Sequence, residues 1–295
     1  MRDYVIVTDS TTDLPIDIAN ELGVTVLNLR FTIDGKEYEN YLDEREMSSK
    51  EFYGLIRQGF MPATTQINVS DYVDCLTKFV KEEKDVFVMC FDSKLSGTYN
   101  SLCVAVNIVK EEYPDAKIIP FDTLSASTGE GLFVYEAVLR KKQGYTIDQL
   151  HEWCLANRSR VNHWFTVDDI DHLKRGGRLT NAAAFAAKLL KIKPFLICDD
   201  EGRLRVKKKC IGRKKAILEL YEKFLENYDE ETNCLIISHG DCYEEAKELA
   251  DKIMNESGKK INKLLINYIG PVIGAHSGPG TIAIFYMGLK DTREY

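Results

Sequence analysis

The sequence predicts an α/β fold built from two α/β domains. In its first half, short apolar runs alternate with amphipathic helical stretches, which is the pattern of a mainly parallel sheet flanked by helices. In its second half, a predicted hairpin is combined with further strands and helices, which indicates a mixed sheet. The length of 295 residues suits two domains of roughly 150 residues each. We place these domains at 1–160 and 161–295, with a linker near 144–163.

The predicted strands of the first domain are short apolar segments, each followed by a helix. Asp85–Phe91 (DVFVMCF) is apolar almost throughout, as in a strand buried on both faces. The helix at Ile16–Leu22 follows Pro15 and precedes Gly23, residues favoured at the two ends of a helix. The other expected strands are Tyr4–Val7, Val24–Arg30 and Lys117–Phe121, and the other expected helices are Met47–Arg57, Ser70–Glu82, Tyr99–Tyr113 and Gly131–Gln143.

The second domain is predicted from a hairpin and the strands and helices around it. Pro194–Cys198 and Arg203–Lys209 form the expected hairpin across the turn sequence DDEG. The remaining expected strands are 163–167, Cys234–Ser238, Lys263–Ile269 and Thr281–Met287, and the expected helices are Asn181–Leu190, Lys214–Asn227 and Glu244–Glu256.

Composition excludes several functional classes. The 39 Lys and Arg residues against 46 Asp and Glu give a net charge of −7, which argues against general nucleic-acid binding. No apolar run reaches the roughly 18 residues of a membrane span, and the apolar start is too short for a signal peptide, so we expect a cytoplasmic protein. The eight cysteines contain no C-x-x-C pair, and we expect reduced, buried thiols and no metal site.

The candidate binding residues lie in loops that follow predicted strands. Asp92–Tyr99 (DSKLSGTY) leads into a helix, so its backbone N–H groups and the Ser96 hydroxyl favour an anion. The alternative is that Ser96 and Thr98 only cap the helix. Met61–Asn68 carries Thr64, Thr65 and Gln66, either as ligand-binding groups or simply as a loop that enters the next helix.

Three further segments share this chemistry. Asp9–Thr12 follows the first strand and either binds an anion or caps a helix. The glycines and proline of Ala275–Thr281 indicate a rigid turn, in which His276 either donates to an anion or packs in the loop. Arg175 and Arg178 flank a pair of glycines and either recognise a carboxylate or phosphate or lie in an exposed turn.

These loops contain hydroxyls, glycines, a histidine and arginines, which favours anion binding over acid–base catalysis. The sequence contains no nucleophile elbow, Walker A motif or G-x-G-x-x-G. Eight cations also gather within 203–215. They form either a solvated hairpin face or a docking surface for an acidic partner or an anionic membrane; they are Arg203, Arg205, Lys207, Lys208, Lys209, Arg213, Lys214 and Lys215.

Taken together and in this order, the loops resemble the DegV family of bacterial fatty-acid-binding proteins. The resemblance extends over essentially the whole chain. The matching segments are VTDSTTDLP at 7–15, PATTQ at 62–66, SKLSGTYNS at 93–101, DTLSAS at 122–127, DHLKRGGRL at 171–179, LKIKP at 190–194 and IGPVIGAHSGPGT at 269–281.

The resemblance implies a long-chain fatty acid in an apolar tunnel between the two domains, with no other cofactor. It implies that Thr64 of the P-x-T-S-Q motif and Ser96 of the L-S-G-T motif bind the carboxylate. This sequence has Thr65 where the family usually has serine, which keeps the hydroxyl, and Ile67 where the family usually has proline. Gly97, His276 and Arg178 are implied neighbours of the head group. Ala182–Leu190 is an apolar stretch that we expect in the tunnel wall.

The family also implies a role as a carrier and not as an enzyme. Such proteins present the fatty acid to a partner fatty acid kinase, and the acyl phosphate that is formed enters phospholipid synthesis. Contact with a membrane surface would then be transient at most. The alternatives are a small-anion binder with a short polar pocket, a hydrolase using Ser96 and His276, and a regulatory module whose ligand tunes a partner.

Overall fold

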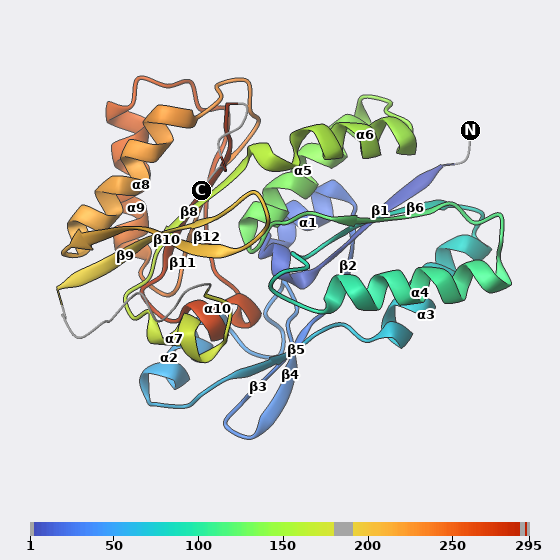
Figure 1. Cartoon of the computed structure of the whole chain (residues 1–295), viewed down its shortest axis with the longest axis horizontal. Helices are drawn as coiled ribbons and strands as arrows, with labels where there is room; N and C mark the ends of the chain where they lie inside the picture. Colours follow the sequence, from blue (N-terminus) through green and yellow to red (C-terminus); the bar gives the residue numbers. More distant parts are fainter. Residues whose placement is uncertain (1–2, 180–190, 290–292, 294–295) are drawn as a thin grey trace.

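The computed structural model describes residues 3–179, 191–289 and 293. Its first large sheet is entirely parallel, as predicted, and has the order β2-β1-β6-β7 (Figure 1). Its strands are β1 (Tyr4–Asp9), β2 (Thr25–Leu27), β6 (Asp85–Cys90) and β7 (Ile118–Asp122).

Alternating side chains of β6 enter two different cores. Phe87 and Met89 join the core that contains α1, α5 and α6, whereas Val86 and Val88 join the core that contains α3 and α4. This is the arrangement expected for a strand buried on both faces. The helices of this half are α1 (Ile16–Leu22), α3 (Val69–Lys81), α4 (Thr98–Glu112), α5 (Thr128–Lys142) and α6 (Ile147–Asn157).

The second large sheet is mixed, also as predicted, with the order β10-β9-β8-β13-β11-β12. The pair β11 and β12 is parallel, and the other pairs are antiparallel, including the expected hairpin of β9 and β10. The strands are β8 (Val161–Thr166), β9 (Ile192–Cys198), β10 (Leu204–Ile211), β11 (Leu235–His239), β12 (Leu264–Tyr268) and β13 (Ile282–Met287).

Helices α8 (Arg213–Asn227) and α9 (Tyr243–Glu256) cover one face of the second sheet. The other face packs on α5, because Phe165, Ile236 and Phe285 share a core with Phe133 and Leu132 of that helix. Helix α5 therefore lies between the two large sheets and belongs to the core of both halves. The domain boundary at 160 stays a prediction.

A third, antiparallel sheet of order β4-β3-β5 was not predicted. We expected one strand over Val24–Arg30 and a loop over Met61–Asn68. The first of these segments does contain β2, but that strand ends at Leu27, and the chain continues into β3 (Arg30–Ile33) and β4 (Lys36–Glu39). The expected loop contains β5 (Ala63–Thr65), so that expectation was wrong at these residues. The sheet and α2 (Ser49–Arg57) pack against α10 (Pro271–Ser277), which brings an N-terminal segment beside a C-terminal one.

Three other segments differ from expectation. The span expected as a linker contains α6, so it is ordered secondary structure. The segment expected as a turn around His276 is the last part of α10, and the turn begins at Gly278. Lys174 and Arg175 end the short helix α7 (Asp171–Arg175). The helix expected at Asn181–Leu190 lies outside the described residues.

Within the described part of the chain, no helix is long and apolar enough to cross a membrane. The same residues contain no cluster of three or more His, Cys, Asp or Glu side chains that could hold a metal ion. The cysteines that the structure describes are free thiols.

Candidate functional site

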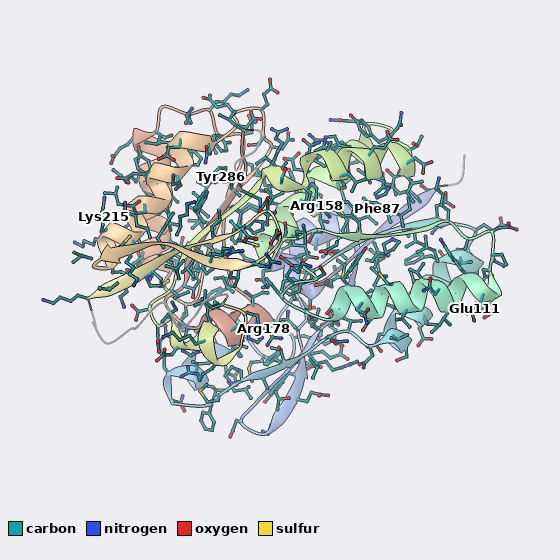
Figure 2. The ribbon with its side chains drawn as sticks, in the orientation of Figure 1. Phe87, Glu111, Arg158, Arg178, Lys215 and Tyr286 are labelled. Carbon is teal, nitrogen blue, oxygen red and sulfur yellow. The ribbon has the colours of Figure 1, made fainter. Side chains whose placement is uncertain are left out.

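A cavity of about 190 Å³ lies between the two halves of the chain and is lined by residues of both. Figure 2 shows Arg178 beside α10, at the junction of the halves. The six residues that the family resemblance implies at the head group all line this one cavity, although they come from four separate segments of the chain, whereas Arg175 does not line it. They are Thr64, Thr65, Ser96, Gly97, Arg178 and His276.

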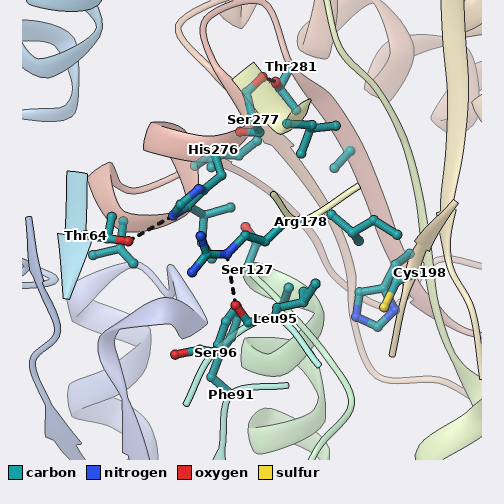
Figure 3. A pocket seen from close by; sticks show the side chains of 18 of the residues that line it. Thr64, Phe91, Leu95, Ser96, Ser127, Arg178, Cys198, His276, Ser277 and Thr281 are labelled. Atoms are coloured by element: carbon teal, nitrogen blue, oxygen red, sulfur yellow. Dashed lines mark hydrogen bonds between the residues drawn. The ribbon is translucent and has the colours of Figure 1, made fainter. Parts of the chain in front are cut away.

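Thr64 and His276 meet at one end of the cavity. The Oγ1 atom of Thr64 lies 2.9 Å from Nε2 of His276, and Figure 3 shows the two side chains pointing at each other. Thr64 is held by β5, which pairs with β3 through the register Phe31–Thr64. His276 is held by α10, whose first residue Pro271 suits the start of a helix.

Ser96 lies in the loop between β6 and α4. Its Oγ atom accepts a hydrogen bond from the backbone N–H of Thr98 at 3.2 Å and lies 2.9 Å from Thr98 Oγ1. The N-cap position of α4 is Gly97, so Ser96 bonds the first N–H of the helix from the residue before the cap, and it also lines the cavity. The two interpretations are compatible, because a hydroxyl that accepts from the backbone keeps its own hydrogen for another partner.

Close packing explains the glycine after Ser96. A Cβ atom at Gly97 would lie 2.1 Å from Oε1 of Gln66, so any larger residue there would have to move the Gln66 amide group from its present position. Nε2 of Gln66 donates to Ser101 Oγ at 2.8 Å, which ties the Thr64 segment to the first turn of α4. No pattern in the sequence predicts this contact.

Arg178 supplies a positive charge beside these hydroxyls. Its Nε atom donates to the backbone carbonyl of Leu95 at 3.1 Å, and its Nη1 atom donates to the carbonyl of Gly176. The guanidinium therefore links the loop after α7 with the loop that carries Ser96. A Cβ atom at Gly176 would lie 2.4 Å from Nδ1 of His276, so this glycine gives the imidazole its room.

His276 is held in its neutral form. Burial and, to a lesser degree, the charge of Arg178 lower the pKa of His276 to about 4. Its Nδ1 atom is buried and has no hydrogen-bond partner among the described residues, and its Nε2 atom faces Thr64. A neutral imidazole beside a hydroxyl can fix which way that hydroxyl points its hydrogen.

The rest of the cavity wall is largely apolar. It includes side chains of the first half and of the second, among them Phe91, Leu95, Phe165, Val272 and Phe285. A polar end with hydroxyls and a guanidinium, joined to an apolar wall, fits a ligand with an anionic head and a hydrocarbon tail.

Sequence reasoning missed several lining residues. Ser127 follows β7 in the DTLSAS segment of the family resemblance, and its Oγ atom donates to Asp13 Oδ2 at 2.6 Å. His163 and Cys198 lie on strands, where no loop signal marks them. Ser277 and Thr281 lie within the expected glycine-rich turn, beside His276.

Two of the other candidate segments have structural roles. Asp9–Thr12 is buried and lies outside the cavity wall, and the Asp9 side chain accepts from Thr11 N as a helix cap. Several of the cations in 203–215 form ion pairs. Arg205 pairs with Asp199, Lys208 with Glu219, and Arg213 with Glu245.

Among the described residues, Ser96 and His276 have different hydrogen-bond partners, so they do not form the Ser–His pair considered in the sequence analysis. The hydroxyl of Ser96 contacts Thr98, and the ring of His276 contacts Thr64. A serine nucleophile is activated by a direct hydrogen bond from its hydroxyl to the base. Here the imidazole of His276 contacts the hydroxyl of Thr64 and not that of Ser96.

Comparisons with known proteins show which proteins share the sequence and the fold. A DegV domain-containing protein of Clostridium perfringens is 42% identical over 297 residues, which cover 100% of both chains. The solved structure of a fatty-acid-binding DegV family protein from Thermus thermophilus has a TM-score of 0.86 at 30% identity and covers 98% of this chain and 100% of its own. A DegV lipid-binding protein from Thermotoga maritima has a TM-score of 0.84 at 30% identity, with 97% and 99% covered.

The family profile described as an uncharacterised protein of the DegV family matches residues 3–288, which is nearly the whole length of the sequence. This chain is therefore a member of the DegV family.

Proposed function

We propose that this chain binds a long-chain fatty acid in the cavity between its two halves, with the carboxylate at Thr64 and Ser96. The observation that carries the proposal is that these hydroxyls, His276 and Arg178 line one cavity whose wall is largely apolar, with Thr64 in contact with His276. The fatty-acid-binding relatives of the same fold support it.

The energetics of the two ends differ. A hydrocarbon tail gains roughly 0.8 kcal/mol for each methylene removed from water, so the tail supplies most of the affinity. Each charge-assisted hydrogen bond to the carboxylate adds about 1.5–3 kcal/mol and fixes the orientation of the ligand. Arg178 adds a favourable charge at the same end.

His276 orients the Thr64 hydroxyl in this proposal. When neutral His276 donates from Nε2 to Thr64 Oγ1, the hydroxyl hydrogen of Thr64 is free to point at the carboxylate. In the opposite tautomer, Thr64 would donate to the ring and present only lone pairs to the ligand, which would repel an anion. The carboxylate therefore selects the tautomer protonated on Nε2.

The test is native mass spectrometry of the purified protein, followed by extraction of the ligand under denaturing conditions. We expect a bound mass in the range of a C14–C18 fatty acid, and we expect the double variant T64V/S96A to lose it. The matched control T32V/S93A removes the same groups outside the cavity wall and keeps the ligand. A protein that stays empty after incubation with fatty acids, or that carries a phosphate, would contradict the proposal.

The further role that we propose is that of a cytoplasmic carrier that presents the carboxylate to a partner fatty acid kinase for formation of acyl phosphate and phospholipid synthesis. The kinase would supply ATP and metal chemistry, and the cations of 203–215 would form the docking surface. Reversing the charges of Lys207, Lys208 and Lys209 should then slow kinase turnover without changing fatty-acid affinity, whereas reversal at exposed Lys110 on α4 should leave turnover unchanged. Unchanged turnover in the triple variant would remove the docking role.

A further inference from the structure

The end of the cavity opposite Thr64 is formed by a cysteine. Figure 3 shows Thr64 and Cys198 on opposite sides of the pocket, with Arg178 between them. Cys198 is the last residue of β9 and is only 1% exposed. Burial raises the pKa of its thiol, so the cavity wall at this point is an uncharged thiol group.

A buried arginine stands directly behind this sulfur. Nη2 of Arg293, a residue that is itself only 1% exposed, lies 3.2 Å from Cys198 Sγ. A guanidinium buried this deeply costs free energy unless its donors are satisfied. Here they are satisfied by backbone carbonyls, at distances of 3.2 Å for Cys198, 3.3 Å for Arg158, 2.6 Å for Leu124 and 2.8 Å for Asp199.

These carbonyls belong to both halves of the chain. Leu124 follows β7 of the first sheet. Cys198 ends β9 of the second sheet, and Asp199 begins the hairpin turn that follows it. Arg293 therefore fixes the two sides of the cavity end relative to each other. Because most of its bonds go to backbone carbonyls, the guanidinium cannot move aside without losing several hydrogen bonds at once.

A second buried group holds the thiol from another side. Oδ2 of Asp92 lies 3.7 Å from Cys198 Sγ, and the Asp92 carboxylate is covered by the hairpin turn, where a Cβ atom at Gly202 would come within 2.5 Å of it. The sulfur is thus in contact with a guanidinium and a carboxyl group that are both buried. An acyl chain that grows past the sulfur would have to displace this polar cluster.

We propose that Cys198, backed by Arg293, is the end wall that sets the longest acyl chain the protein accepts. This inference rests on the proposed function, because it assigns the far end of the same cavity. Each methylene that still fits before the wall should add roughly fourfold in affinity. The first methylene beyond it should add nothing, since the wall is held by backbone hydrogen bonds and cannot adapt as a flexible apolar side chain would.

The test is a series of dissociation constants for saturated fatty acids from C12 to C20, measured on delipidated wild type, C198A and C198L. We expect affinity to rise with length and then to level off or fall at a definite length in the wild type. C198A should move that length up by roughly one or two carbons, because it opens a space that the chain can fill. C198L should move it down. The control C154A makes the same truncation at a buried cysteine outside the cavity and should leave the profile unchanged.

The possible outcomes distinguish a failure of the end-wall assignment from a failure of the proposed fatty-acid binding. If the wild type and C198A both bind fatty acids and their length profiles coincide, the end-wall assignment is wrong and the proposed function stands. If the wild type binds no member of the series, the proposed function fails and the end wall fails with it. C198S keeps nearly the volume of the native side chain and should keep the native profile, so a shift in C198S as large as that in C198A would show that size is not the cause.

Discussion

The Oγ1 atom of Thr64 lies 2.9 Å from Nε2 of His276, a contact between residues 212 positions apart in the sequence. Thr64 belongs to the small sheet of the first half, and His276 to α10 in the second. The polar end of the cavity therefore exists only when these two elements are packed together. Its chemistry can be tested by changes to either partner or to the residues that place them.

Replacing Thr64 with valine removes the hydroxyl and keeps the shape of the side chain. We expect fatty-acid affinity to fall by about 10- to 150-fold, which is the effect of losing one hydrogen bond to a charged group, of about 1.5–3 kcal/mol. The rescue variant T64S keeps a hydroxyl and should recover most of the affinity. Isothermal titration of the delipidated proteins measures both values, and equal affinity of T64V and wild type would remove Thr64 from the carboxylate site.

Gly176 offers a test of His276 that leaves the imidazole in the protein. Its φ of −67° suits alanine, but a Cβ atom there would lie 2.4 Å from His276 Nδ1. G176A should therefore push the ring away from Thr64 and lower fatty-acid affinity by roughly the value of one hydrogen bond. In the control G54A, no described atom outside the adjacent helix backbone and the two neighbouring residues lies within 4 Å of the new Cβ. Wild-type affinity in a folded G176A would show that the ring position does not matter for binding.

The two large sheets could be predicted because most of their strands are buried, and a buried strand has an almost continuous run of apolar residues. β6 is buried along its whole length, and its composition is that of a central strand. The small sheet was missed because its strands carry little of that signal. Residues 36–39 are KEYE and 63–65 are ATT, with partly or fully exposed side chains, and only their pairing with β3 makes them strands.

The site was partly predictable for a similar reason. Hydroxyl-rich loops such as those of Thr64 and Ser96 stand out in the sequence, whereas Cys198 lies within a strand and resembles any buried cysteine. Arg293 contacts it from 95 residues away, near the end of the chain. Two residues of ordinary types, distant in sequence and joined mainly through backbone carbonyls, leave no local pattern to find. Such a contact becomes visible only in the fold.

The ligand-free protein should lose stability as the pH falls, in part because of His276. Burial lowers the pKa of His276 to about 4, whereas an unfolded histidine titrates near 6.5. Between these values the unfolded chain binds a proton that the folded chain does not, so the free energy of unfolding decreases as the pH is lowered from about 6.5 to 4. The contribution of this one residue is on the order of 3 kcal/mol.

Urea unfolding of wild type and H276Q across this pH range checks the prediction. The glutamine cannot take up the proton, so the free energy of unfolding of H276Q should decrease less steeply with falling pH than that of the wild type. His239 also has its pKa lowered to about 4 by burial, and it lies outside the cavity wall. The carboxylate of a bound fatty acid should favour the protonated form of His276 and so reduce the loss of unfolding free energy at low pH that is due to His276. The loss due to His239 should be unchanged, because His239 lies outside the cavity wall. Parallel curves for wild type and H276Q would contradict the assignment.

Asp13 should make the protein less stable as the pH rises. Burial raises the pKa of Asp13 to about 8, while an unfolded aspartate titrates near 3.9. Between these values the folded chain keeps a proton that the unfolded chain has released, so each unit of rising pH lowers the free energy of unfolding by up to about 1.4 kcal/mol. The variant D13N cannot ionise, and asparagine tolerates the left-handed backbone at this position, where φ is 46°.

Urea unfolding from pH 5 to pH 8 measures the effect. The free energy of unfolding of D13N, relative to that of the wild type, should rise steadily over this range. The control D17N removes a carboxylate from an exposed neighbouring site and should show no such trend. If D13N and wild type differ by a constant amount over this range, Asp13 does not carry its proton in the folded protein.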